Sequence, residues 1–198
     1  MEMKLRLNIP ETLEDIKLMW YQRYLSNEEK YETSIFKRRS FIEQCCGFDS
    51  LGLVELSPKD SYYLFKEIER AFNGRYELPI IKKIIVSKNE FKLIDLNKIT
   101  MSEYKVLEDS LLDLNKIHMA LSVLYRDSSG KYNKDYDEFM KHMPLNVVYG
   151  VLNHFTKLFN DIMKEITGND LPITTEHILL SGKDNKDFVR IVLKNNNR

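Results

Sequence analysis

The segment Pro144–Ile166, PLNVVYGVLNHFTKLFNDIMKEI, decides the fold that this sequence predicts. Its large apolar side chains recur every three or four residues, the spacing of one helix face, at Leu145, Val148, Leu152, Phe155, Phe159, Ile162 and Ile166. Val151, Leu158 and Met163 widen this face beyond a narrow stripe. A helix that is apolar over so much of its circumference must be covered on several sides. We therefore expect 144–166 to be the central helix of a helical domain.

Further helix signals precede this segment. Gly47 stands where a helix end takes a left-handed residue, and Ser57-Pro58 combines a serine cap with proline at the first helical position. Thr100 with Glu103 forms a capping box. These signals predict helices over residues 13–25, 33–46, 58–73 and 100–125. Their periodicity turns Ile35, Phe36, Tyr62 and Phe65 toward the core.

Two segments change to β-type patterns. IIKKIIV and FKLID flank SKNE within 80–95, and HILLS and FVRIVLK flank GKDNK within 177–193. Both patterns predict β-hairpins. With 198 residues, the chain has the length of one sizeable core. We expect a mainly α (α+β) single domain spanning 1–198, with the hairpin region 171–198 as an appendage for assembly.

Composition argues against several classes of partner. The chain has 30 Lys and Arg against 30 Asp and Glu, so no net charge draws it to nucleic acid or an anionic membrane. Cys45 and Cys46 are adjacent and have no second pair for a disulfide framework or zinc site. No apolar run reaches the roughly 18 residues of a membrane helix. We expect a protein made and used in a reducing compartment, without a membrane or sequence-specific nucleic-acid partner.

The residues that carry chemistry do not form a recognisable site. The four histidines, His118, His142, His154 and His177, lie far apart without neighbouring ligands at metal-binding spacing. Phosphate-binding glycine loops, a GxSxG elbow and HExxH are absent from the sequence. We expect no catalytic residue, metal, cofactor or small-molecule substrate. A small hydrolase or nuclease with a site assembled from distant segments is the competing hypothesis.

Aromatic residues are more informative. The chain has 11 tyrosines and 10 phenylalanines. Several tyrosines fall at polar or edge positions: Tyr21, Tyr24, Tyr31, Tyr63, Tyr76, Tyr132 and Tyr136. Tyrosine suits surfaces that bury an apolar ring and still hydrogen bond. These rings either cover the rim of the core or form contacts with other proteins.

Three segments carry a family resemblance: IPETLEDIKLMWYQRYL, FIEQCCGFDSLGLVELSPKDSYYLFKEIERAF and KIHMALSVLYRDSSGKYNKDYDEFMKHMPLNVVYGVLNHF. Together they resemble small morphogenesis proteins of tailed double-stranded DNA bacteriophages. The middle segment is similar to tail assembly chaperones, and the last resembles proteins encoded among phage head and tail genes, including those of crAss-like phages. The shared motifs are packing patterns, so the resemblance implies no catalytic residue.

This resemblance implies a non-enzymatic virion protein, assembled in the host cytoplasm as a subunit of a head-to-tail connector or neck ring. Its partners would be copies of itself and other phage head and tail proteins. The alternative is a cytosolic tail assembly chaperone that holds tape-measure or tail-tube subunits. We expect the following residues to contact partners: Tyr62, Tyr63, Tyr132, Tyr136, Phe139, Phe188 and Ile191.

Overall fold

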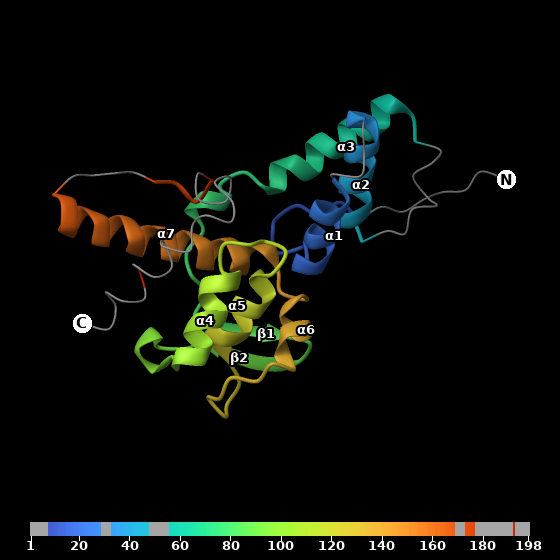
Figure 1. Ribbon diagram of the computed structural model, residues 1–198. Coiled ribbons are helices and arrows are strands. Elements are labelled where there is room, and N and C mark those ends of the chain that lie inside the picture. Colours follow the sequence, from blue (N-terminus) through green and yellow to red (C-terminus); the bar gives the residue numbers. More distant parts are fainter. Residues whose placement is uncertain (1–7, 29–32, 48–55, 169–172, 177–191, 193–198) are drawn as a thin grey trace. The chain divides into compact units, whose positions relative to one another are not determined.

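The computed structural model describes residues 8–28, 33–47, 56–168, 173–176 and 192 (Figure 1). The described residues form seven α-helices and a three-stranded antiparallel sheet, which confirms the mainly α (α+β) fold class. The chain divides into two compact units. Residues Met1–Gly74 with Pro144–Asn146 form the first unit, and Arg75–Met143 with Val147–Arg198 form the second. Folding of 1–198 as one domain stays a prediction.

The first unit contains three helices, α1 (Leu18–Glu28), α2 (Ser34–Cys45) and α3 (Pro58–Ala71). Its core is aromatic. The Phe41 ring on α2 lies 5.0 Å from Tyr24, 5.4 Å from Phe65 and 5.7 Å from Phe72, measured between ring centroids. Tilted and edge-on rings of this kind add to the stability that burial alone supplies. Phe41 therefore joins α1 and α3 to α2.

The helix signals of the sequence are confirmed for α2 and α3. Ser57 accepts a hydrogen bond from the Asp60 N–H at 3.1 Å, and Pro58 occupies the first helical position. Gly47 follows α2 with φ +69°. The position where a side chain would begin faces the Trp20 ring. A Cβ at Gly47 would meet that ring at 3.0 Å. Glycine is required there both by the left-handed backbone and by the space.

The first helix begins later than predicted, at Leu18. The Asp15 carboxylate accepts from the N–H groups of Glu11 at 3.1 Å and Thr12 at 3.0 Å, which closes a separate turn. After that turn, the Ile16 carbonyl accepts from the Leu145 N–H at 2.9 Å. The backbone at Ile16 is thus paired with a distant segment, and the helix starts beyond it.

Three apolar residues predicted to be buried are exposed instead. Ile35, Phe36 and Tyr62 have 46%, 52% and 51% of their surface accessible. The side of α3 that faces inward carries Ser61, Leu64, Ile68 and Ala71. Tyr62 is not on this inward face of α3, so its side chain points outward. Ile35 and Phe36 occupy the first turn of α2, whereas its buried residues begin at Ser40.

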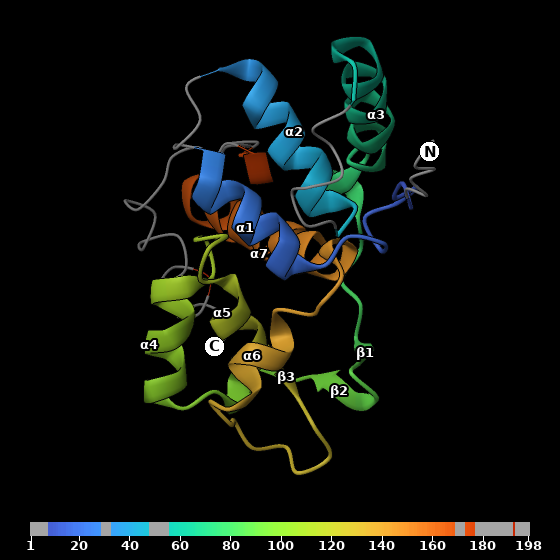
Figure 2. The same cartoon turned by 90° about the vertical axis from the view of Figure 1, so that its right-hand side faces the viewer.

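The described part of the second unit contains the sheet and helices α4 to α7, which can be followed in Figure 2. Its elements in chain order are β1 (Lys83–Val86), β2 (Asn89–Leu93), α4 (Met101–Ser110), α5 (Ile117–Leu124), β3 (Tyr125–Arg126), α6 (Tyr136–Met140) and α7 (Leu145–Thr167), whose first two residues belong to the first unit. The strand order is β1-β2-β3. Figures 1 and 2 show α4 and α5 side by side.

The predicted hairpin at 80–95 is confirmed. Val86 pairs with Asn89 across a two-residue turn, and Ser87 and Lys88 in that turn have φ +49° and +70°. Two left-handed residues match the twist of a hairpin. The second predicted hairpin, 177–193, lies outside the described residues except for Val192, which is buried and has helical backbone.

The predicted long helix over 100–125 is wrong, because the chain leaves the helix twice. Helix α4 ends at Ser110, and the Asp113 carboxylate accepts from the Asn115 N–H at 3.0 Å, forming a turn before α5 begins. Tyr125 lies in β3, not in a helix. Its buried ring is fixed by a 2.6 Å hydrogen bond from the hydroxyl to the Ile81 carbonyl.

Helix α7 is confirmed as the central helix. Among its apolar residues, Val148, Val151, Leu152 and Phe155 are at most 1% exposed. The burial ends before the helix does, because Ile166 is 64% exposed. The apolar face that the sequence predicts along the whole helix is therefore buried as far as Phe159, which is 8% exposed, and the residues of α7 beyond it are half-buried or exposed.

Candidate interaction surfaces

Helices α2 and α3 carry an aromatic surface, which we call the α2–α3 surface; it consists of the exposed Tyr62, Tyr63 and Lys66 and the half-buried Arg38 and Phe65. Tyr62 and Tyr63 are 51% and 62% exposed, so both are accessible to a partner. For Tyr62 this exposure agrees with its choice as a contact residue and not with its predicted burial. The Arg38 guanidinium lies 5.1 Å from the Tyr62 ring centroid and 5.8 Å from that of Phe65. Lys66 approaches the same two rings at 6.0 and 5.8 Å. Cations over ring faces hold the aromatic side chains in place at the surface.

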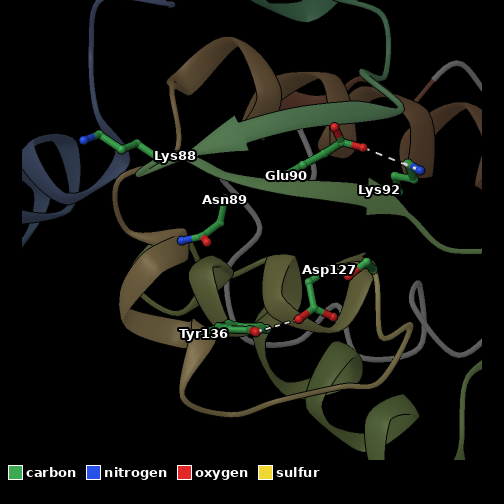
Figure 3. Close-up of a pocket in the computed structure, with 7 residues that line it drawn as sticks. Lys88, Asn89, Glu90, Lys92, Asp127 and Tyr136 are labelled. Carbon is green, nitrogen blue, oxygen red and sulfur yellow. Dashed lines mark hydrogen bonds and ion pairs between the residues drawn. The ribbon is translucent and has the colours of Figure 1, made fainter.

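The other predicted contact residues that the structure describes, Tyr132, Tyr136 and Phe139, belong to the second unit. Tyr136 donates a 2.7 Å hydrogen bond to Asp127, and its ring meets Phe91 edge-on at 5.3 Å (Figure 3). Phe139 lies edge-on to Tyr136 at 5.9 Å and is 37% exposed. Tyr136 is therefore a structural ring beside the core, and of these three side chains Phe139 is the most accessible. Phe188 and Ile191 lie outside the described residues.

A polar cavity of about 440 Å³ adjoins Tyr136 and is lined by Lys88, Asn89, Glu90, Lys92, Asp127, Ser128 and Tyr136. In Figure 3, Asp127 and Tyr136 point toward each other and Lys88 points away from them. The Asp127 carboxylate also accepts from the Ser129 N–H and hydroxyl, at 2.9 and 2.5 Å. These bonds, first that of the Ser129 hydroxyl, lower the pKa of Asp127. Because its carboxylate is already engaged, Asp127 is a poor candidate for acid–base chemistry.

Tyr132 is half-buried and faces a buried polar pair, so it is not the free surface ring that the sequence suggested. Burial and the Asp137 carboxylate raise the pKa of Tyr132, while a hydrogen bond with Ser122 opposes them. Ser122 in turn contacts Asp137 and lies 2.8 Å from the Met119 carbonyl. Ser122 is completely buried, so no substrate reaches its hydroxyl. This cluster ties α5 to α6 and serves no nucleophilic role.

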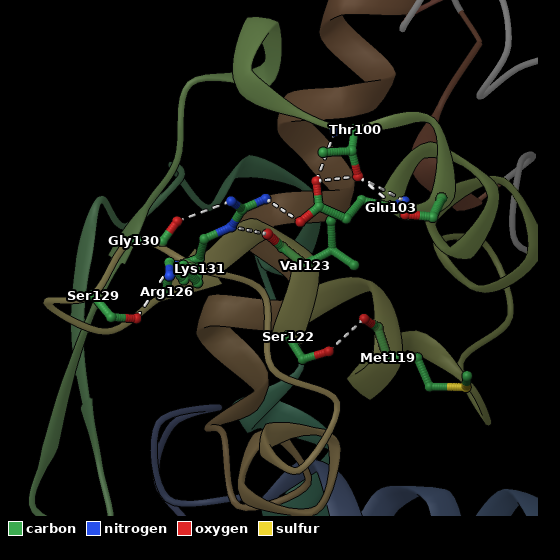
Figure 4. Close-up of polar contacts among 10 residues, drawn as sticks. Thr100, Glu103, Met119, Ser122, Val123, Arg126, Ser129, Gly130 and Lys131 are labelled. Carbon is green, nitrogen blue, oxygen red and sulfur yellow. Dashed lines mark hydrogen bonds and ion pairs between the residues drawn. The ribbon is translucent and has the colours of Figure 1, made fainter.

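A second buried network surrounds Arg126 (Figure 4). Its guanidinium donates to Glu103 at 2.9 Å, to the Gly130 carbonyl at 3.0 Å and to the Val123 carbonyl at 3.2 Å. Glu103 also accepts from the Thr100 N–H at 2.7 Å, completing the predicted capping box. The charged groups thus satisfy one another and the start of α4. Sequence reasoning recognised the cap but missed Arg126, which is 23 residues from Glu103.

The outer edge of the sheet provides a third exposed feature. β1 is an edge strand, and Ile85 on it is 70% exposed. Exposed edge strands with an apolar side chain are sites where another extended chain can add. The predicted hairpin within 80–95 includes this strand, although Ile85 was not among the predicted contact residues.

Other candidates for chemistry are not supported in the described part of the chain. No group of three or more His, Cys, Asp or Glu there could hold a metal ion. Burial raises the pKa of Cys46 to about 11 and that of Cys45 further, which leaves both as thiols at neutral pH. Burial likewise lowers the pKa of His118 and His154. Cys45 lies in the core, and the other three side chains are half-buried.

Comparisons with known proteins add no relative. The chain matches no protein-family model, and no curated protein or solved structure is similar enough to count as a match. Among the described residues, no helix has the length and hydropathy needed to cross a membrane. The functional argument therefore depends on the surfaces described above.

Proposed function

We propose that this protein is a non-enzymatic structural subunit of a tailed-bacteriophage particle, a component of the head-to-tail connector or neck ring. The observation that carries the proposal is the α2–α3 surface, where two neighbouring tyrosines are more than half exposed. A folded protein that displays large rings beside cations is equipped for contact with other proteins. The family resemblance of the sequence supplies the phage context.

The chemistry of this surface favours a protein partner. Tyrosine and arginine are enriched at protein interfaces because they bury a large area and keep a hydrogen-bonding group. Phe36 on α2 adds another aromatic ring that is 52% exposed. Repeated copies of such a surface, each meeting a different surface of the next subunit, would close into a ring.

A cytosolic tail assembly chaperone is the alternative. It is favoured by the exposed apolar side chains Ile35, Phe36 and Ile85, which could hold an unassembled tape-measure or tail-tube subunit. A chaperone leaves before the particle is complete, whereas a ring subunit stays. Quantitative mass spectrometry of purified phage particles distinguishes them. We expect the protein at a few to about a dozen copies per particle, and its absence would overturn the connector proposal.

The α2–α3 surface can be tested directly with the variant Tyr62→Ser/Tyr63→Ser. We expect the far-ultraviolet circular dichroism spectrum to be unchanged, because both side chains are mostly exposed. Self-association, measured by sedimentation velocity over a range of concentrations, should weaken at least tenfold, which corresponds to about 1.4 kcal/mol.

Met101→Ser is the matched control, because Met101 is 83% exposed and belongs to the second unit. Its association should equal that of the wild type. Equal association of the double tyrosine variant and the wild type would exclude this surface as the contact between copies.

A further inference from the structure

On its outer edge, the backbone of β1 presents groups that no other described strand pairs with. The Leu93 N–H donates to the Lys82 carbonyl at 2.9 Å, which marks Lys82 and Leu93 as a hydrogen-bonded pair of the ladder. In an antiparallel ladder every second residue points its N–H and C=O toward the same neighbour. In β1, Ile84 and Val86 therefore bond to β2, and Lys83 and Ile85 direct their backbone groups away from it.

The outward groups of Lys83 and Ile85 meet no backbone partner within the described residues. The Ile85 side chain lies on the exposed face of the sheet, while Ile84 and Val86 lie on the buried face at 7% and 3% exposure. An incoming strand would therefore gain backbone hydrogen bonds along the edge and apolar contact with Ile85. Lys83 and Ile85 would form the backbone hydrogen bonds to the incoming strand, whereas Ile84 and Val86 form those that hold β1 to β2.

The hairpin is basic although the whole chain has no net charge. Residues 82–93 carry four lysines, Lys82, Lys83, Lys88 and Lys92, against the single carboxylate of Glu90. Glu90 pairs with Lys83 at 2.8 Å and with Lys92 at 3.5 Å, the latter visible in Figure 3. Lys82 and Lys88, at the two ends of β1, have no ion-pair partner in the described part of the chain.

We infer that β1 binds an extended, acidic segment of another protein, which adds to the sheet as a fourth strand beside β1. Backbone hydrogen bonds to Lys83 and Ile85 supply the affinity common to strand addition. Acidic side chains facing Lys82 and Lys88, which have no ion-pair partner among the described residues, supply the selectivity. A second copy of the chain would bind the β1 edge less favourably than an acidic segment, because pairing two β1 strands would bring two sets of lysines together. The inference is independent of the phage proposal, since purified protein and a synthetic peptide test it.

The probe is an acetylated and amidated heptapeptide that alternates glutamate with valine. The same peptide with lysine in place of glutamate is its control. We expect the glutamate peptide to slow amide hydrogen exchange at Lys83 and Ile85, observed by nuclear magnetic resonance, and the amides of Ile84 and Val86 to change little. The lysine peptide should bind at least tenfold more weakly.

The matched variants are Ile85→Pro and Ile85→Thr. Proline removes the outward N–H of residue 85 and leaves the bonds between β1 and β2 intact, since that N–H takes no part in them. Threonine keeps the N–H and the β-branched shape. We expect Ile85→Pro to weaken binding of the glutamate peptide at least tenfold and Ile85→Thr less than threefold, with the thermal midpoints of both variants recorded to verify folding.

Four results would overturn the inference. These are no binding of the glutamate peptide at millimolar concentration, equal binding of both peptides, and wild-type affinity in a folded Ile85→Pro variant. The fourth is protection of the Ile85 amide that increases with protein concentration in the absence of peptide, because it would identify a second copy as the occupant.

Discussion

At the scale of single residues, Gly150 shows how closely α7 approaches the chain before the sheet. A Cβ at this position would lie 2.4 Å from the Pro79 carbonyl oxygen, far inside van der Waals contact. One turn along, Asn153 donates to the carbonyls of Arg75 at 2.9 Å and Leu78 at 3.1 Å. Because Gly150 has no Cβ and the Asn153 amide bonds to two carbonyls of this segment, the helix lies directly against the 75–79 backbone. No local sequence signal indicates either role.

Gly150→Ala should therefore destabilise the protein, although alanine is the better helix former by up to about 1 kcal/mol. The methyl group meets backbone, which cannot rotate away, so we expect a net loss of about 1–3 kcal/mol in the free energy of unfolding. Urea unfolding followed by circular dichroism measures it. Lys157→Ala, an exposed change on the same helix, should stay within about 0.5 kcal/mol of the wild type. An equally stable Gly150→Ala variant would contradict the close approach.

At the scale of elements, the start of α4 depends on a charge from beyond the helix. Thr100 and Glu103 form the cap that the sequence predicted, and Arg126 from β3 forms an ion pair with Glu103. Both charged side chains are nearly buried, at 9% exposure for Arg126 and 6% for Glu103. Removing one member of such a pair leaves the other charge without compensation. The ion pair thus connects a helix start to the sheet.

This pair should make stability depend on pH. Burial acts to raise the pKa of Glu103, but the Thr100 hydrogen bonds and the Arg126 charge outweigh it and hold the pKa below its usual value. A lowered pKa in the folded state stabilises the fold above the unfolded pKa of about 4.3, and this contribution is lost as the pH falls through the folded value.

We expect Glu103→Gln to be less stable than the wild type at pH 7 and the difference to shrink steadily between pH 5 and pH 3. Urea unfolding at several pH values measures this, with Glu165→Gln, an exposed change on α7, as the control. A difference that stays constant over that range would exclude the charge as its cause.

At the scale of the whole molecule, the chain has two compact units, and whether they fold together as the predicted single domain can be tested. The second unit has its own core, in which Phe91, Leu121 and Phe155 are at most 1% exposed. The first unit draws on Pro144–Asn146 in addition to its own helices. There Lys17 pairs with Pro144, next to the bond from the Leu145 N–H to Ile16. The first unit is thus built from two distant parts of the sequence.

We expect the fragment 75–198 to fold alone and the fragment 1–74 to be less stable than its counterpart in the full chain, because 1–74 lacks the pairing with 144–146. Thermal unfolding of both fragments, followed by circular dichroism, tests this. An unfolded 75–198 fragment would instead support one domain that folds only as a whole.

The sequence by itself determined the helices α2, α3 and α7 and the first hairpin. Their signals are local: the Ser57 cap, the glycines at helix ends and the apolar spacing along 144–166 act within a few residues of where they stand. Tertiary structure decided the exposure of Ile35, Phe36 and Tyr62 and the pairing of Arg126 with Glu103. An apolar or charged side chain is buried only if a distant segment covers it, and one sequence does not state which segments meet.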